Sequence, residues 1–181
     1  ETMPVASMKA GFGVKKGNPK GITKLSDIKN PDLKIGIGNP NAASVGKFTQ
    51  QILTKHNLWE GFDPTVLFPT VNELANATKL GTVDASILWD AVAYQYPEVD
   101  FVSLPEFDAE KKDITIGVLK SSTQATEALK FCRYLTASDK GLKVFQADGY
   151  EPVRGDKWAE NPELLLGLTP LTMVAGSLFR R

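Results

Sequence analysis

The stretch from Gly36 to Phe48, GIGNPNAASVGKF, contains the residue types of an anion-binding turn. It follows the apolar run DLKI and leads into residues with helical spacing, so a glycine-rich turn joins a strand to a helix N-terminus. Free backbone N–H groups at such a helix start, with the helix dipole behind them, favour a negatively charged ligand. The alternative interpretation is an ordinary capped helix start without a ligand.

Two nucleotide-binding motifs do not fit this stretch. A dinucleotide fingerprint has the form G-x-G-x-x-G, but Asn41 stands in the place of the third glycine. A P-loop has the form G-x-x-x-x-G-K-[ST], whereas Gly38 and Gly46 are too far apart and Lys47 precedes Phe48, which has no hydroxyl for magnesium. The sequence therefore does not predict nucleotide chemistry.

Residues for catalysis or metal binding are scarce. The single histidine, His56, lies in the polar segment TKHN at a predicted helix end, where a solvated or capping role is expected. The single cysteine, Cys132, has apolar neighbours at helical spacing and is expected in the core. No Ser-His or Cys-His set and no metal-ligand spacing is found, so we predict no enzyme, no catalytic residue, no metal and no cofactor.

Composition indicates a globular protein. With 181 residues, of which 42% are hydrophobic, the chain can bury a core, and its 21 basic and 21 acidic residues provide no field that would attract nucleic acid or an acidic membrane. Glu1 opens the sequence without the basic and apolar regions of a signal peptide. The apolar run Leu164–Phe179 is broken by Gly167 and Pro170 and is shorter than the roughly 20 residues of a membrane span, so a buried strand or two is expected there.

The hydrophobic pattern predicts strands that alternate with helices. The predicted strands are short, apolar and rich in β-branched or aromatic residues: Gly11–Val14, Leu33–Gly38, Val66–Phe68, Ala85–Leu88, Phe101–Leu104 and Ile114–Leu119. Helical stripes begin near Val45, Val71, Thr123 and Ser138, and the second has a capping box at Thr70. This alternation predicts an α/β fold with a parallel or mixed sheet covered on both faces, in which ligands lie beyond the carboxyl ends of the strands.

Three segments in order carry a resemblance to a known family. They are KKGNPKGITKLSDIKNPDLKIGIGNPNAASVGKF, LWEGFDPTVLFPTVNELANATKLGTVDASILWDAVA and ITIGVLKSSTQATEALKFCRYLTASDKGLKVFQADGYEP. Together they resemble the second half of a molybdate/tungstate-type periplasmic solute-binding protein of an ABC transporter, over about residues 4–153. The resemblance implies a type 2 periplasmic-binding-protein fold, in which two α/β lobes joined by two crossing strands close over a tetrahedral oxyanion.

The resemblance also implies a division of the chain. Residues 15–107 would form the second, central lobe, and residues 1–14 and 108–181 the crossing strands and the C-terminal part of an incomplete first lobe. The crossings match approximately Val5–Phe12 and Asp108–Thr115. The family's opening strands have no counterpart before Glu1, so we expect an incomplete lobe, exposed apolar surface and self-association.

The expected ligand-binding residues are Ser44, Val45, Val71, Trp89 and Asp90. Ser44, Val45 and Val71 lie at helix starts where backbone N–H groups can donate to an oxyanion. In the resemblance, Val45 and Val71 match positions whose amides contact the anion, and Trp89 matches a position where many relatives have a tyrosine. The alternative for Trp89 is a core plug, that is, an aromatic side chain that fills the core and binds no ligand. An ionised Asp90 would repel a dianion, so it points to solvent or coordinates the metal of the oxyanion.

The predicted function is therefore a receptor for a small inorganic oxyanion, molybdate or tungstate, that works with an ABC transporter permease in the periplasm or at the cell surface. No nucleic acid is expected as a partner, because no basic recognition helix is present. Two alternatives remain open, a ligand-sensing regulatory domain of the same fold and an orphan fragment that serves protein–protein contacts.

Overall fold

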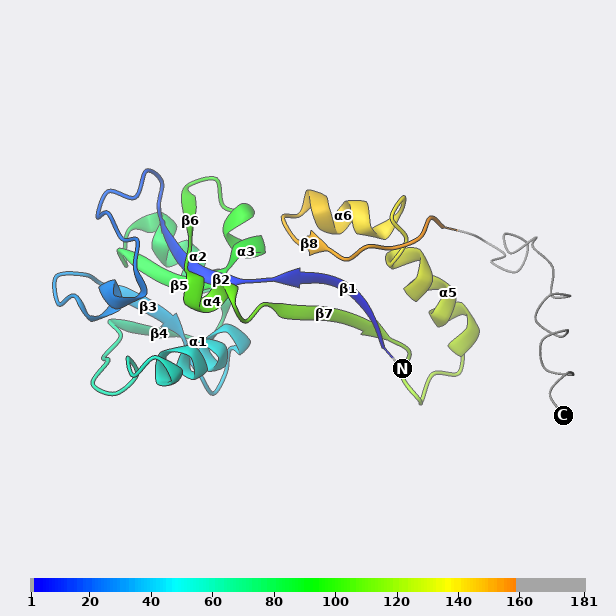
Figure 1. The fold of residues 1–181 in the computed structure, drawn as a ribbon, viewed down its shortest axis with the longest axis horizontal. Coiled ribbons are helices and arrows are strands. Elements are labelled where there is room, and N and C mark those ends of the chain that lie inside the picture. The colour runs from blue at the N-terminus through cyan, green and yellow to red at the C-terminus, as the bar shows by residue number, and fades with distance from the viewer. Residues whose placement is uncertain (1, 159–181) are drawn as a thin grey trace, which may run out of the picture.

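The computed structural model describes residues 2–158, and the strands predicted within Leu164–Phe179 lie outside this range. Figure 1 shows two groups of elements joined by long strands. The strands are β1 (Thr2–Met8), β2 (Ala10–Lys15), β3 (Ile35–Gly38), β4 (Val66–Phe68), β5 (Ala85–Trp89), β6 (Val99–Ser103), β7 (Lys112–Gly117) and β8 (Glu151–Pro152). The helices are the 3-10 helix η1 (Leu25–Lys29) and the α-helices α1 (Ser44–Lys55), α2 (Val71–Leu80), α3 (Asp90–Tyr94), α4 (Pro105–Asp108), α5 (Ala125–Leu135) and α6 (Gly141–Ala147).

The larger group is a mixed five-stranded sheet with the order β4-β3-β5-β2-β6. Strands β4, β3 and β5 run parallel, and β2 is antiparallel to β5 and β6. The parallel strands therefore end at one edge, where α1, α2 and α3 begin. We call this group, residues 10–108, the five-stranded unit.

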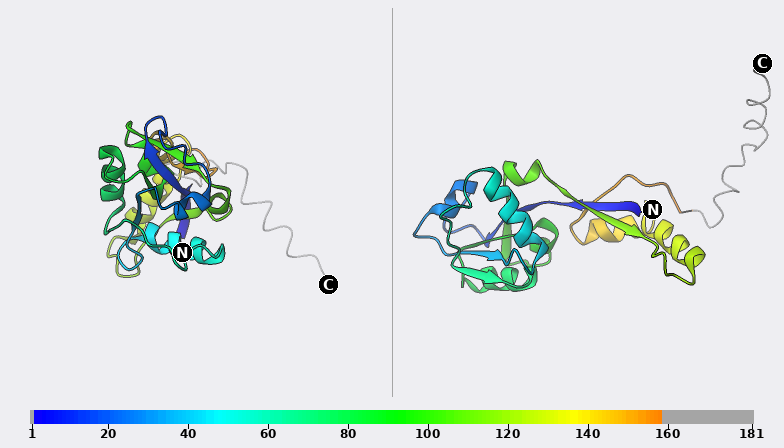
Figure 2. Two further views of the ribbon diagram at one scale, coloured as in Figure 1. Left: turned by 90° about the vertical axis from the view of Figure 1, so that its left-hand side faces the viewer. Right: turned by 90° about the horizontal axis from the view of Figure 1, so that it is seen from below.

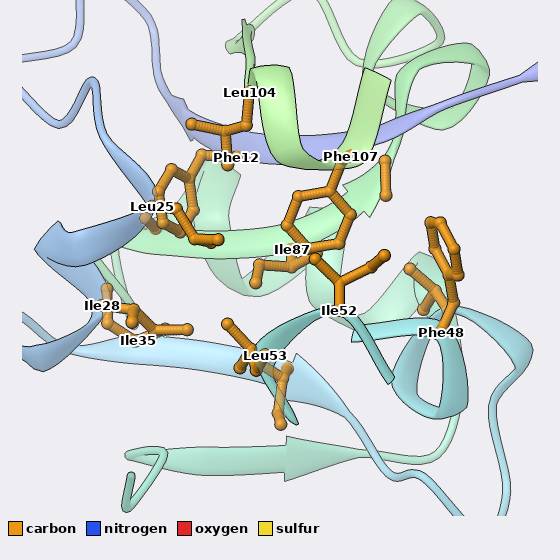
Figure 3. Close-up of a cluster of buried hydrophobic side chains, with 14 of the residues drawn as sticks. Phe12, Leu25, Ile28, Ile35, Phe48, Ile52, Leu53, Ile87, Leu104 and Phe107 are labelled. Carbon is orange, nitrogen blue, oxygen red and sulfur yellow. The ribbon is translucent and has the colours of Figure 1, made fainter. Parts of the chain in front are cut away.

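Side chains that alternate along the strands cover the two faces of this sheet. On one face Phe12 and Ile87 belong to the main core, where they meet Ile52 of α1 and Phe107 of α4 (Figure 3). On the other face, Leu88 joins a smaller cluster formed by α2, α3 and β6. The predicted mixed sheet with helices on both faces is confirmed.

Local sequence signals set the limits of α2. The Thr70 hydroxyl accepts a hydrogen bond from the Glu73 N–H, and the Glu73 carboxylate accepts one from the Thr70 N–H, which is the predicted capping box. Gly81 ends the helix in the left-handed conformation, with φ of 76°.

The smaller group contains a three-stranded antiparallel sheet with the order β7-β1-β8, together with α5 and α6. We call residues 2–8 and 112–158 the three-stranded unit. One nearly continuous strand, β1 followed by β2, passes from this sheet into the other, and β7 returns beside it (Figures 1 and 2). The crossing predicted at Val5–Phe12 is thus interrupted at Lys9, because β1 and β2 pair in different sheets.

The three-stranded unit buries little of its apolar surface. Cys132 is the buried residue of α5, as predicted for a core thiol, whereas Phe131 in the same helix is 58% exposed. Further exposed apolar side chains in this unit are Leu119, Leu129, Tyr134 and Val144. Within residues 2–158, no helix is long and apolar enough to cross a membrane.

Candidate functional site

The glycines of GIGNPNAASVGKF allow α1 to touch the end of β3. A Cβ atom on Gly38 would lie 2.9 Å from the Gly46 nitrogen, and one on Gly46 would overlap the Gly38 carbonyl. Because backbone meets backbone here, neither position has room for a side chain. The glycine spacing is therefore explained by close packing of a helix start on a strand end, without a nucleotide.

The turn between β3 and α1 is held by Asn39. Its side-chain oxygen accepts a hydrogen bond from the Asn41 N–H at 2.9 Å, and its carbonyl accepts from the Ala42 and Ala43 N–H groups. The Asn39 N–H donates to the Phe68 carbonyl at the end of β4, at 2.7 Å. The turn is thus fixed on the carboxyl edge of two parallel strands.

The N-terminus of α1 has free donors. Its N-cap residue, Ala43, is extended, with φ of −112°, and has no side chain that can cap the helix. The first intrahelical bond runs from the Lys47 N–H to the Ala43 carbonyl. Among the described residues, the N–H groups of Ser44, Val45 and Gly46 have no acceptor. Ser44 is exposed, whereas Val45 and Gly46 are buried, so the Ser44 end of this helix start is the part most open to an anion.

The N-terminus of α2 is less favourable for an anion. Its capping box already satisfies the Glu73 N–H and places the Glu73 carboxylate beside the first turn. Val71 follows the cap and keeps the N–H of a first-turn residue, but the nearby negative charge opposes a bound anion. Of the two helix starts that the sequence predicted, α1 is therefore the stronger candidate.

Trp89 ends β5 and is 5% exposed. Its ring stacks on that of Phe48, one turn into α1, with centroids 5.4 Å apart and an interplanar angle of 19°. Phe48 also makes an edge contact with Phe107. This burial agrees with the core-plug alternative for Trp89, and the stack holds the first half of α1 against the end of β5.

A cation lies over the ring of Phe48. The Lys112 Nζ is 4.5 Å from the centroid of the Phe48 ring, which is a cation–π distance. Lys112 begins β7, and its ammonium has no carboxylate within 4.0 Å among residues 2–158. Sequence analysis did not identify this residue, because only the return of β7 beside the five-stranded unit brings it near α1.

Asp90 is half-buried and its carboxylate is engaged by the backbone. Oδ1 accepts hydrogen bonds from the Ala91 N–H at 2.8 Å and the Lys9 N–H at 3.2 Å. Desolvation raises the pKa of the Asp90 carboxyl, although these two N–H groups oppose the shift. Asp90 therefore does not point freely to solvent, because two backbone N–H groups hold its carboxylate. No group of three or more His, Cys, Asp or Glu side chains that could hold a metal ion occurs in the described residues.

These residues lie at one edge of an α/β sheet, the geometry of a ligand-binding protein whose site is built from helix starts. The chain belongs to the bacterial extracellular solute-binding proteins, whose family model matches residues 1–151. Proteins of this family bind solutes and are not enzymes. His56 is exposed at the C-terminal end of α1, where the sequence predicted a solvated or capping role.

Individual relatives agree with this family. A Haemophilus influenzae protein named only as a binding protein is 25% identical over 146 residues, which is 79% of this chain and 59% of that protein. The periplasmic molybdate-binding protein of Azotobacter vinelandii is 18% identical with a TM-score of 0.66, over 84% of this chain and 68% of that one. The sulfate-binding protein SubI of Mycobacterium tuberculosis is 17% identical with a TM-score of 0.69, over 93% of this chain and 63% of that one.

The chain thus spans about three fifths of the length of the curated relative that it matches. At these low identities the two solved structures establish the fold of the chain and leave its ligand open. They are named for different tetrahedral oxyanions, so the fold alone does not separate molybdate from sulfate.

Proposed function

We propose that this chain is part of a receptor for a small tetrahedral oxyanion, molybdate or tungstate, that delivers its ligand to an ABC transporter permease in the periplasm or at the cell surface. Residues 15–107 would form the second lobe, with residues 1–14 and 108–181 as crossing strands and part of the first. The observation that supports the proposal most is the uncapped N-terminus of α1 at the carboxyl edge of three parallel strands.

The proposed chemistry depends on backbone donors. An oxyanion placed before α1 would accept hydrogen bonds from the Ser44 and Val45 N–H groups, and Val71 would donate from α2. A hydrogen bond to a charged group contributes about 1.5–3 kcal/mol, so a few such donors account for a large share of the binding free energy. Backbone donors are neutral and fixed in position, so they add no mobile countercharge. Such a site can therefore distinguish anions by their size and by their number of oxygens.

Trp89 and Asp90 complete the proposed site in different ways. The Trp89 indole N–H is a donor only, and it lies in the same stack that positions α1. Asp90 lies at the edge of the site, but its Oδ1 already accepts two backbone hydrogen bonds. This favours a role in shaping the site over coordination of the bound oxyanion.

Substitution to proline tests the backbone donors directly. Ser44 is the first residue of α1, and proline is well tolerated at this position because its missing N–H has no intrahelical partner. Ala43 is extended, as a residue before proline must be. We expect Ser44→Pro to weaken molybdate binding about tenfold or more by calorimetry, with little change in the midpoint of thermal unfolding.

The matched control is Ser44→Ala, which removes the hydroxyl and keeps the N–H, and it should bind almost as the parent does. Sulfate and tungstate titrated against the same three proteins would rank the anions. A Ser44→Pro variant that binds every anion as tightly as Ser44→Ala would show that the start of α1 is not the site. Because the chain spans about three fifths of the relative that it matches, we expect its own affinity to be weaker than that of a two-lobed receptor.

A further inference from the structure

Lys9 is the single residue between β1 and β2, and so the point at which the chain leaves one sheet for the other. Met8 is the last residue of β1 to pair with β7, and Ala10 is the first of β2 to pair with β5. Two units joined by short connections change their relative orientation when the backbone of a connecting residue rotates. The surroundings of Lys9 therefore bear on how the two units are placed.

Asp90 holds both backbone polar groups of Lys9. The Lys9 N–H donates to Asp90 Oδ1 at 3.2 Å, and the Asp90 N–H donates to the Lys9 carbonyl at 2.9 Å. The same Oδ1 accepts from the Ala91 N–H, which fixes the carboxylate on the first turn of α3. Rotation of the Lys9 backbone would break these bonds.

The Lys9 side chain is also bound to the five-stranded unit. Its Nζ donates to the Ser103 hydroxyl at 2.8 Å and lies 3.3 Å from Asp108 Oδ1. The Ser103 hydroxyl in turn donates to the Asp108 carboxylate. These contacts are more exposed than the backbone pair and solvent weakens them, so they are the lesser restraint.

Ion pairs to both units flank the second connection. Glu110 pairs with Lys55 at the end of α1, and the next residue, Lys111, pairs with Glu151 of β8. Both pairs are between exposed side chains, which are worth little individually. At the second connection the backbone bonds are local, such as that from the Glu110 N–H to the Phe107 carbonyl, whereas the Asp90–Lys9 pair joins the first connection to a residue far away in the sequence.

We propose that Asp90 is a positioning residue that sets the orientation of the two units by holding the Lys9 backbone. Asp90 directly follows Trp89, so the same residue belongs to the edge of the candidate site and to the connection between the units. The hydrogen-bond acceptor on Oδ1 performs this role, and the negative charge is not needed for it. The inference does not depend on which anion binds, or on whether one does.

Distances between spin labels on the two units test this role without any ligand. Labels would be placed at Lys47→Cys in α1 and Lys143→Cys in α6, both exposed, in the full chain with Cys132→Ala as background. We expect Asp90→Ala to broaden or shift the distance distribution. Asp90→Asn keeps an amide oxygen that can accept both N–H bonds, so it should keep the parental distribution.

The control is Asp100→Ala. Asp100 also accepts a backbone N–H, from Gly17, and pairs with Lys16, but it binds no residue of either connection, so its loss should not alter the distances. A parental distribution in folded Asp90→Ala would overturn the proposal. So would equal broadening in Asp90→Asn, which would assign the effect to charge, or in Asp100→Ala, which would indicate general loosening.

Amide hydrogen exchange provides a test on the parent alone, should Asp90→Ala fail to fold. The Lys9 N–H lies outside both strand ladders, so its protection depends on Asp90. We expect it to exchange much more slowly than a free amide. Exchange at the unprotected rate would overturn the proposal.

Discussion

The indole of Trp89 stacks on the ring of Phe48, with centroids 5.4 Å apart, and so joins the end of β5 to the second turn of α1. This stack positions the uncapped start of α1, because Phe48 lies about one turn beyond Ser44. A residue buried in the core can thus influence the candidate site through the helix that it positions.

Trp89→Phe should affect both stability and binding. The smaller ring leaves a void against Phe48, and we expect the free energy of unfolding in urea to fall by about 1–2 kcal/mol. Loss of the indole donor should also weaken molybdate binding by about 1 kcal/mol. Trp59→Phe, whose ring packs on Phe62, is the control that should not change binding. Unchanged affinity in Trp89→Phe would show that the tryptophan has a structural role and does not contribute to binding.

Gly46→Ala should destabilise the protein although alanine is the better helix former. The added Cβ would overlap the Gly38 carbonyl, which is backbone and cannot rotate away. We expect a loss of about 1–3 kcal/mol in the free energy of unfolding, after the gain of roughly 1 kcal/mol in helix propensity is offset. Ser44→Ala, in the same turn, should be nearly neutral. A more stable Gly46→Ala would mean that α1 does not approach β3 as closely as described.

The sequence predicted the five-stranded unit better than it predicted the connection between the units. Apolar runs such as Val66–Phe68 and the capping box at Thr70 are local signals, and β4 and α2 formed where these signals lie. No local signal distinguishes Lys9 from the other lysines. Its role follows from the pairing of β1 and β2 in different sheets, which is a long-range property. For the same reason Lys112 could not be placed beside Phe48 from the sequence.

Self-association is expected because the three-stranded unit exposes apolar side chains. A hollow of about 350 Å³ lies between β1 and α5 and is lined by Met3, Val118, Ala125, Leu129 and Arg133. Phe131 is exposed on the same helix. We expect light scattering to give a mass above that of the monomer, and Leu129→Lys combined with Phe131→Lys to lower it. Leu80→Lys, the same substitution at an exposed leucine of α2, should not lower the mass. A monomer at high concentration would contradict this prediction.

The pH dependence of stability tests the environment of Asp90, and Asp100 serves as a comparison for which the opposite pH dependence is expected. Burial raises the pKa of the Asp90 carboxyl, so the folded state binds its proton more tightly than the unfolded state does. The resulting contribution to stability is present below the unfolded pKa of about 3.9 and is lost as the pH rises through the folded pKa. Asp90→Asn cannot ionise, so it should gain stability relative to the parent as the pH is raised from acid to neutral.

Asp100 should behave in the opposite way. The Gly17 N–H and the Lys16 ammonium lower the pKa of its carboxyl, so its contribution to stability is present at neutral pH and is lost as the pH falls through the folded pKa. Asp100→Asn should therefore lose stability relative to the parent as the pH rises. Urea unfolding of the parent and both variants from about pH 3 to about pH 8 measures the two differences. If both variants changed in the same direction with pH, the environment described for Asp90 would be wrong, because burial, the largest influence on its pKa, acts against its hydrogen bonds and opposes Asp100 in sign.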